Sequence, residues 1–182
     1  MKEESHYIRI VEVGRIYMEA NMNYETAWEI EYVVAGYFDY LSHLIVPNIY
    51  AYSIGLHGGY EMDLVIMSSS GYLQEVEIKV SRGDLIKDAD KTRWRYPGWA
   101  STKKMWFAMP EKMDRPNCAE HVPEFAGILI VGTSGKVKVT REATINKEAK
   151  PLNIKQQYKL ARLGAIRIWG PKRNMVMREQ RK

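Results

Sequence analysis

The sequence contains a single cysteine, Cys118, among its 182 residues. One cysteine excludes an internal disulfide and a zinc site built from several cysteines, and it suits a reducing compartment. No apolar stretch approaches the roughly 20 residues that span a bilayer, so we expect no membrane segment. Residues 1–5 are charged, without the apolar run of a signal peptide. We therefore expect a cytoplasmic protein.

What the chain does contain is the composition of an ordinary globular protein, with 46% hydrophobic and 27% charged residues. Its length fits one domain with a sizeable core. We expect that domain to cover residues 1–170 and a mobile basic tail to cover residues 171–182. The formal net charge of +5 favours a polyanionic partner over an acidic small molecule.

The stretch from Glu61 to Asp84 has the pattern of a β-hairpin with charged residues in its second strand. Met62, Leu64 and Ile66 alternate with Asp63, Val65 and Met67, and a Ser-Ser-Ser-Gly turn signal follows. Alternation then resumes over residues 72–80. The two-residue period of a strand gives one face of this segment to three charged residues: Glu75, Glu77 and Lys79.

Two interpretations of this charged face are open, because Lys and Glu are almost never fully buried without partners. The first is a solvated salt-bridge ladder of Glu75, Glu77 and Lys79 on the protein surface. The second is a metal site, because folding the hairpin would bring the lone Asp63 of the first strand near Glu77 and Lys79. Carboxylate oxygens are ligands that suit Mg²⁺ or Mn²⁺.

From Tyr24 to Tyr40 the apolar period becomes helical, with Asn23 as the candidate N-cap. At about 100° per residue, Glu31 lies beside the apolar stripe whereas Glu29 points away from it. Geometry therefore favours Glu31 over Glu29 as the acid near the site, and solvated helix-surface glutamates are the alternative. The stripe consists of Ala27, Ile30, Val34, Tyr37 and Leu41.

At Asp63 and at Glu77-Ile78-Lys79 the sequence resembles the PD-(D/E)XK nuclease superfamily. Asp63 stands at the place of the first acidic residue, and the tripeptide matches (D/E)-X-K. Over about residues 25–110 the chain resembles the MmcB-like DNA-repair branch, through Glu-Met-Asp-Leu-Val-Ile, Val-Glu-Ile-Lys-Val-Ser and a Trp-rich segment that ends at Pro110. Met62 replaces the Pro of the family name, which is the loosest letter of that motif.

The resemblance implies an α/β fold with a restriction-endonuclease-like core of order α-β-β-β-α-β, its mixed sheet extended by strands after residue 125. It implies a divalent-metal-dependent nuclease, a hydrolase of phosphodiester bonds, in DNA repair, recombination or the processing of phage or mobile-element DNA. Asp63, Glu77 and the main-chain carbonyl of Ile78 would hold Mg²⁺ or Mn²⁺. Lys79 would orient a water or stabilise developing charge, and Glu31 would complete the metal shell.

Basic residues gather after the hairpin and are interleaved with Trp94, Tyr96 and Trp99. Basic and aromatic residues together suit a nucleic-acid backbone with unstacked bases, although a solvated helix face followed by core aromatics is the alternative. A non-catalytic nucleic-acid-binding module on the same fold also remains open, as does a homodimer. The candidate nucleic-acid-binding residues are Arg82, Lys87, Lys91, Arg93 and Arg95.

Local patterns predict the remaining elements. Ser81 is the expected N-cap of a helix, and Pro47 places the strand of residues 44–53 at a sheet edge. The other expected elements are strands at residues 103–109, 125–131, 136–140 and 166–169, and a helix at residues 153–163 that Gly164 closes.

Overall fold

The structure is a computed structural model that describes residues 26–89 and 101–179. The first described elements confirm the expected α-β-β-β-α-β order and the α/β fold class, consistent with a restriction-endonuclease-like core. These elements are α2 (Ala27–Tyr37), β1 (Leu44–Tyr50), β2 (Glu61–Met67), β3 (Leu73–Ile78), α3 (Arg82–Ala89) and β4 (Thr102–Pro110).

The rest of the chain extends this core, as expected. A short 3₁₀ helix, η1 (Ala51–Ile54), stands between β1 and β2. Beyond β4 follow η4 (Glu111–Met113), α4 (Pro116–Ala119), β5 (Gly127–Val131), β6 (Val137–Arg141) and α5 (Ile154–Glu179).

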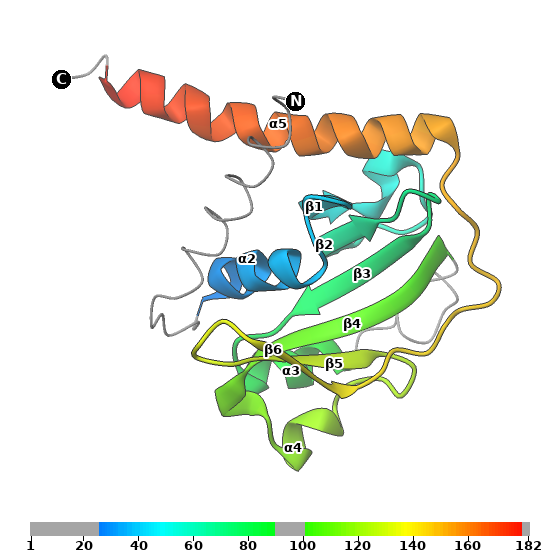
Figure 1. Ribbon diagram of the computed structural model, residues 1–182, viewed down its shortest axis with the longest axis vertical. Helices are drawn as coiled ribbons and strands as arrows, with labels where there is room; N and C mark the ends of the chain where they lie inside the picture. Colours follow the sequence, from blue (N-terminus) through cyan, green and yellow to red (C-terminus); the bar gives the residue numbers. More distant parts are fainter. Residues whose placement is uncertain (1–25, 90–100, 180–182) are drawn as a thin grey trace, which may run out of the picture.

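The described strands form one six-stranded mixed sheet in the order β1-β2-β3-β4-β5-β6. The strands β1, β2 and β3 form an antiparallel meander, β3, β4 and β5 are parallel, and β6 closes the sheet antiparallel to β5. Parallel neighbours need a crossover connection, and α3 lies in the one between β3 and β4 (Figure 1). The carboxyl end of β3 therefore lies beside the beginning of β2, at one end of the strands.

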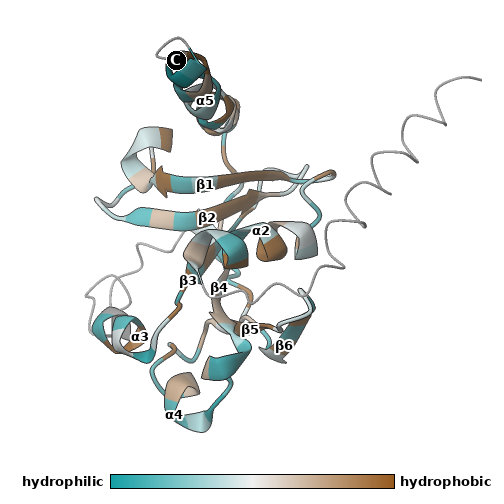
Figure 2. Ribbon diagram, turned by 90° about the vertical axis from the view of Figure 1, so that its left-hand side faces the viewer, coloured by the Kyte–Doolittle hydropathy of each residue, from teal (hydrophilic) through white to brown (hydrophobic). Residues whose placement is uncertain are grey.

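Helices cover both faces of the sheet. Ile30, Val33 and Val34 of α2 are buried against residues of β2 to β5 on one face. Leu85 of α3 is buried on the other face, in a cluster with residues of β4 and β5. A third cluster packs Leu160 of α5 against β1, η1 and β2. Figure 2 shows long brown, apolar stretches along the strands between these layers.

The helix α2 is shorter than the sequence pattern predicts. Thr26 is its N-cap, in a capping box with Glu29, whereas the expected cap Asn23 lies outside the described residues. The expected stripe is buried only in its centre, because the helix ends at Tyr37 and the chain turns at Asp39, which has a φ of 56°. Tyr37 and Leu41 are consequently exposed.

The expectation for the carboxyl end is wrong. Gly164 does not close the last helix, residues 166–169 form no strand, and residues 171–179 are helical, because α5 runs from Ile154 to Glu179 through Pro171. A Cβ added to Gly164 would meet Val46 of β1 at 3.1 Å. The glycine thus permits close packing of a helix on a strand instead of ending the helix.

Several local expectations are confirmed. The strand β1 with Pro47 and the strand β6 are the two edges of the sheet, and β5 is buried along its whole length. The hydroxyl of Ser81 accepts a hydrogen bond from the Asp84 N–H, as expected of an N-cap. Among the described helices, none combines the length and the apolar character needed to cross a bilayer.

Candidate active site

Asp63 and Glu77 lie on the neighbouring strands β2 and β3, at the end of the sheet where β3 finishes. The β2–β3 register pairs Leu64 with Val76, so Asp63 and Glu77 form the next opposed positions and face the same side of the sheet. The Oδ2 atom of Asp63 accepts a hydrogen bond of 2.8 Å from the main-chain N–H of Ile78. The predicted convergence of Asp63 with the Glu77-Ile78-Lys79 tripeptide is therefore present in the fold.

Lys79 is a buried cation with two acidic neighbours. Its Nζ atom lies 2.8 Å from Oε1 of Glu77 and 3.7 Å from Oδ2 of Asp84 at the beginning of α3. Its main-chain N–H donates to the carbonyl of Ala108, which ties the residue to β4. The surface-ladder interpretation is wrong, because Glu75, Glu77 and Lys79 are only 2%, 3% and 4% exposed.

The two glutamates of α2 have different surroundings. The carboxylate of Glu29 accepts hydrogen bonds from the main-chain N–H and the hydroxyl of Thr26, at the start of the helix. Glu31 lies in the wall of the pocket that also contains Asp63 and Glu77. The structure therefore places Glu31, the residue preferred from the sequence, at the site.

The surroundings of Glu31 raise its pKa above the usual value for a glutamate. Burial raises the pKa of Glu31 most, and the negative charge of Asp63 raises it further. The positive charge of Arg167 and a hydrogen bond with the Asn48 side chain act in the opposite direction. The site thus brings carboxylates from α2 and β2 within electrostatic reach of each other.

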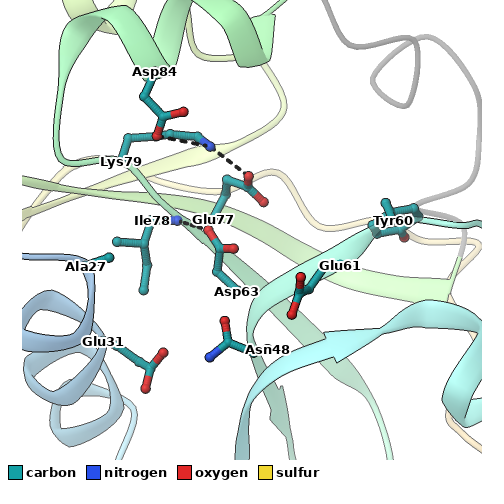
Figure 3. A pocket seen from close by; sticks show the side chains of 10 residues that line it. All are labelled: Ala27, Glu31, Asn48, Tyr60, Glu61, Asp63, Glu77, Ile78, Lys79 and Asp84. Atoms are coloured by element: carbon teal, nitrogen blue, oxygen red, sulfur yellow. Dashed lines mark hydrogen bonds and ion pairs between the residues drawn. The ribbon is translucent and has the colours of Figure 1, made fainter.

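These side chains surround one pocket of about 490 Å³ at the sheet edge (Figure 3). Its described lining contains five carboxylates and a single cation, Lys79. Ligands of open α/β sheets commonly bind at the carboxyl ends of the parallel strands. The lining residues are Ala27, Glu31, Asn48, Tyr60, Glu61, Asp63, Glu77, Ile78, Lys79 and Asp84.

Several of these residues are not predicted from the sequence. Glu61 has a signal, because it lies two positions before Asp63 on the same strand and therefore on the same face. Asp84 marks only the end of the hairpin stretch in the sequence, and in the structure its carboxylate approaches Lys79. Asn48 has no usable signal, and neither does Arg167, which bonds to Asn48 from outside the lining, since α5 and β1 meet only after folding.

The donor set suits a hard divalent cation, because it consists of carboxylates together with carbonyl oxygens. Asp63 and Glu77 are held by Ile78 and Lys79 in this state. Within residues 26–89 and 101–179, no group of three or more His, Cys, Asp or Glu side chains has a ready-made metal-binding arrangement.

The candidate nucleic-acid-binding residues are only partly described. Arg82 and Lys87 on α3 are exposed, and Nη2 of Arg82 lies 3.4 Å from Nε2 of His121. Lys91, Arg93 and Arg95 lie outside the described residues, as do Trp94, Tyr96 and Trp99.

Comparisons with known proteins identify a similar fold and no activity. No family model matches the chain, and the search of curated proteins found no match. The fold is similar to the solved structure of SPO1766, a protein of unknown function from Silicibacter pomeroyi, with a TM-score of 0.51 and 20% sequence identity. The similarity covers 81% of this chain and 88% of the other. At this identity the likeness establishes the α/β architecture alone.

Proposed function

We propose that this chain is a divalent-metal-dependent phosphodiesterase that acts on DNA. The observation that carries the proposal is a pocket lined by five carboxylates and one buried lysine, in a chain whose net charge is +5. A pocket of that charge favours a cation, whereas the basic remainder of the chain favours a polyanion. A metal-dependent nuclease needs both.

In the proposed reaction, the acidic residues would bind the metal and Lys79 would have a separate role. Asp63, Glu77 and the carbonyl of Ile78 would hold Mg²⁺ or Mn²⁺, with Glu31 as a further carboxylate from α2. The bound cation would neutralise the phosphodiester charge and lower the pKa of a bound water. Lys79 supplies no ligand to a cation. Its ammonium group, 2.8 Å from Glu77, would instead orient the attacking water or stabilise charge on the phosphoryl oxygens.

We also propose a substrate, a cellular location and an oligomeric state. The substrate would be DNA in repair, recombination or the processing of phage or mobile-element DNA, held in part by the exposed Arg82 and Lys87. A cytoplasmic location and a homodimer belong to the same proposal. The buried state of the single cysteine, Cys118, suits a reducing compartment.

The direct test is cleavage of circular single-stranded, circular duplex and linear duplex DNA in Mg²⁺, in Mn²⁺ and in EDTA. The parent protein is expected to cut at least one substrate with metal and none with EDTA. Asp63→Asn and Glu77→Gln should remove cleavage, and Glu148→Gln, at an exposed position outside the pocket, should preserve it. Equal cutting by Asp63→Asn and the parent would contradict the proposed site.

A second candidate is a nucleic-acid-binding module that does not cut. The observation that favours it is that Asp63 and Glu77 already have internal partners in Ile78 and Lys79. Under this alternative, DNA binding would be equally strong in EDTA and in Mg²⁺, and no substrate would be cleaved. Isothermal calorimetry with Mn²⁺ separates the two candidates, because only the nuclease needs a metal site that Asp63→Asn destroys.

A further inference from the structure

We propose that Arg167 of α5 binds a phosphate group of the DNA strand next to the scissile phosphate, as a substrate-binding residue of the Asp63–Glu77 pocket. This inference rests on the proposed nuclease function and names a residue that its sequence motif does not contain. Arg167 lies 104 positions after Asp63 in the chain and belongs to the helix that the sequence pattern predicted to end before it.

The position of Arg167 follows from one contact between distant segments. Its Nη2 atom donates a hydrogen bond to the main-chain carbonyl of Asn48, and Asn48 lines the pocket. The β1–β2 register pairs Pro47 with Leu64 and Ile49 with Met62. Asn48 therefore lies opposite Asp63, and its partner Arg167 lies at the same side of the pocket.

The backbone at Asn48 explains why that carbonyl is available to α5. Asn48 has a φ of 53°, in the left-handed region that asparagine adopts more readily than most residues. The strand register resumes at Ile49, so the departure is local. Unusual backbone conformations of this kind concentrate at functional sites, and here one links the pocket wall to α5.

The charge of the pocket indicates the ligand of Arg167. Among the described lining residues, Lys79 is the single cation, and it is buried between Glu77 and Asp84. A phosphodiester that approaches five carboxylates needs positive charge at the mouth of the pocket. Arg167 is exposed, it is bonded to Asn48 of the pocket wall, and its charge acts on Glu31. A guanidinium presents five N–H donors in a planar fork, so the bond to Asn48 leaves donors that can contact a phosphate.

The course of α5 beyond Arg167 agrees with a polyanionic ligand. Figure 1 shows the C-terminal half of the helix projecting past the sheet on the side where β3 ends. From Ile154 to Glu179 the helix carries a single acidic residue, Glu179. Beyond Arg167 its basic residues are Lys172, Arg173 and Arg178. The helix therefore continues positive potential outward from the pocket mouth.

The test compares Arg167→Gln with Arg162→Gln in the full chain. Arg162 is exposed on the same helix, five positions earlier and therefore about 140° around the helix axis from Arg167. Fluorescence anisotropy with a labelled oligonucleotide, over a series of KCl concentrations in Mg²⁺, measures the salt dependence of binding. Arg167→Gln is expected to reduce the log–log salt slope by about one unit, whereas Arg162→Gln should leave it unchanged.

Cleavage kinetics and thermal unfolding complete the experiment. A lost phosphate contact in Arg167→Gln should raise KM by about tenfold, and Arg167→Lys should restore part of that loss because it retains the charge without the fork. An unchanged salt slope and KM, with or without a lower melting temperature, would give Arg167 a structural role and overturn the inference.

The failure of this inference differs from the failure of the proposed function. If the parent binds DNA without cutting it, the nuclease proposal fails and the salt slopes still decide the role of Arg167. If the parent cuts DNA and Arg167→Gln behaves like Arg162→Gln, the nuclease proposal stands and Arg167 does not bind phosphate. A parent that neither binds nor cuts DNA overturns both.

Discussion

Lys79 shows at the scale of one residue how the site is held. A buried ammonium is costly unless it is paired, and Lys79, at 4% exposure, lies 2.8 Å from Glu77 and 3.7 Å from Asp84. Its main-chain bond to Ala108 fixes the backbone at the end of β3. The lysine is therefore held in place by two acids and a strand.

The first prediction separates the role of Lys79 from that of Asp63. Lys79→Ala should lose DNA cleavage and keep most of the Mn²⁺ affinity, because lysine is not a metal ligand. Asp63→Asn should lose both. Cleavage assays and isothermal calorimetry measure the two effects. Equal Mn²⁺ binding by Asp63→Asn and the parent would contradict the metal assignment.

The second prediction concerns Glu31, whose pKa is raised in the folded protein. Because its folded pKa is above the unfolded value, the native state loses stability as pH rises from below the usual value of 4.5 through the raised pKa. Glu31→Gln should therefore raise the melting temperature in EDTA at neutral pH, and the gain should vanish well below pH 4.5. The variant should also bind Mn²⁺ more weakly than the parent.

Glu29→Gln is the matched control for Glu31→Gln. Glutamine also serves at this position of a capping box, so the bonds between Thr26 and residue 29 should survive. The stability change should be about half a kcal/mol or less and nearly independent of the metal. A loss of cleavage in Glu29→Gln alone would show that α2 presents another side to the pocket.

At the scale of elements, the parallel part of the sheet depends on a close approach between β4 and β5. Trp106 on β4 is paired with Gly127 on β5. A Cβ at position 127 would stand 2.3 Å from Cε3 of the Trp106 ring and 2.7 Å from the N atom of Ala143. Trp106 also donates a hydrogen bond of 3.0 Å to Gln74 on β3, so its indole cannot move without losing that bond.

The third prediction follows from this packing. Gly127→Ala should lower the free energy of unfolding by about 1 to 3 kcal/mol, the usual range for overpacking a core. Gly132→Ala is the control, because a Cβ there would meet its nearest atom only at 3.5 Å. Urea denaturation of both variants measures the difference. Similar stability for the two would mean that the Trp106 ring relaxes at no cost.

The fourth prediction tests how α5 is attached to the sheet. Leu160 is completely buried against β1 and β2, whereas Ile154 at the start of the same helix is 84% exposed. Leu160→Ala should cost about 2 to 5 kcal/mol through the lost contact and the cavity left behind. Ile154→Ala should change stability by about half a kcal/mol or less, as judged by the same denaturation measurements.

At the scale of the whole molecule, the two halves of α5 have different surroundings. Its first half is anchored by Leu160 and Gly164, and its second half projects with Trp169, Met175 and Val176 exposed. The first half packs on the sheet and stabilises the domain. The second half is exposed and carries more basic than acidic residues.

The fifth prediction compares the chain truncated after Gly170 with the full chain. Residues 171–179 are exposed, so truncation should change the melting temperature little. It should remove helical signal from the circular dichroism spectrum, because these residues are helical. It should also weaken DNA binding and reduce its salt slope. An unchanged dichroism spectrum would contradict the helical assignment of this segment.

Elements with local sequence signals follow from the amino-acid pattern alone. The alternation around Asp63 and Glu77, the turn at Gly71 and the cap at Ser81 all correspond to features of the fold. The α-β-β-β-α-β order follows from the same patterns, because strand and helix periods are written in neighbouring residues. The preference for Glu31 over Glu29 came from helical geometry and agrees with the pocket.

Features that depend on contacts between distant segments do not follow from local sequence patterns. Gly164 looks like a helix end in the sequence, and its packing against Val46 keeps it inside α5. Glu75, Glu77 and Lys79 fit a surface pattern equally well until the sheet and its covering helices bury them. Arg167 contacts Asn48 of the pocket wall because α5 packs on β1. Contacts of this kind arise from shape and burial across the whole chain, which no local period encodes.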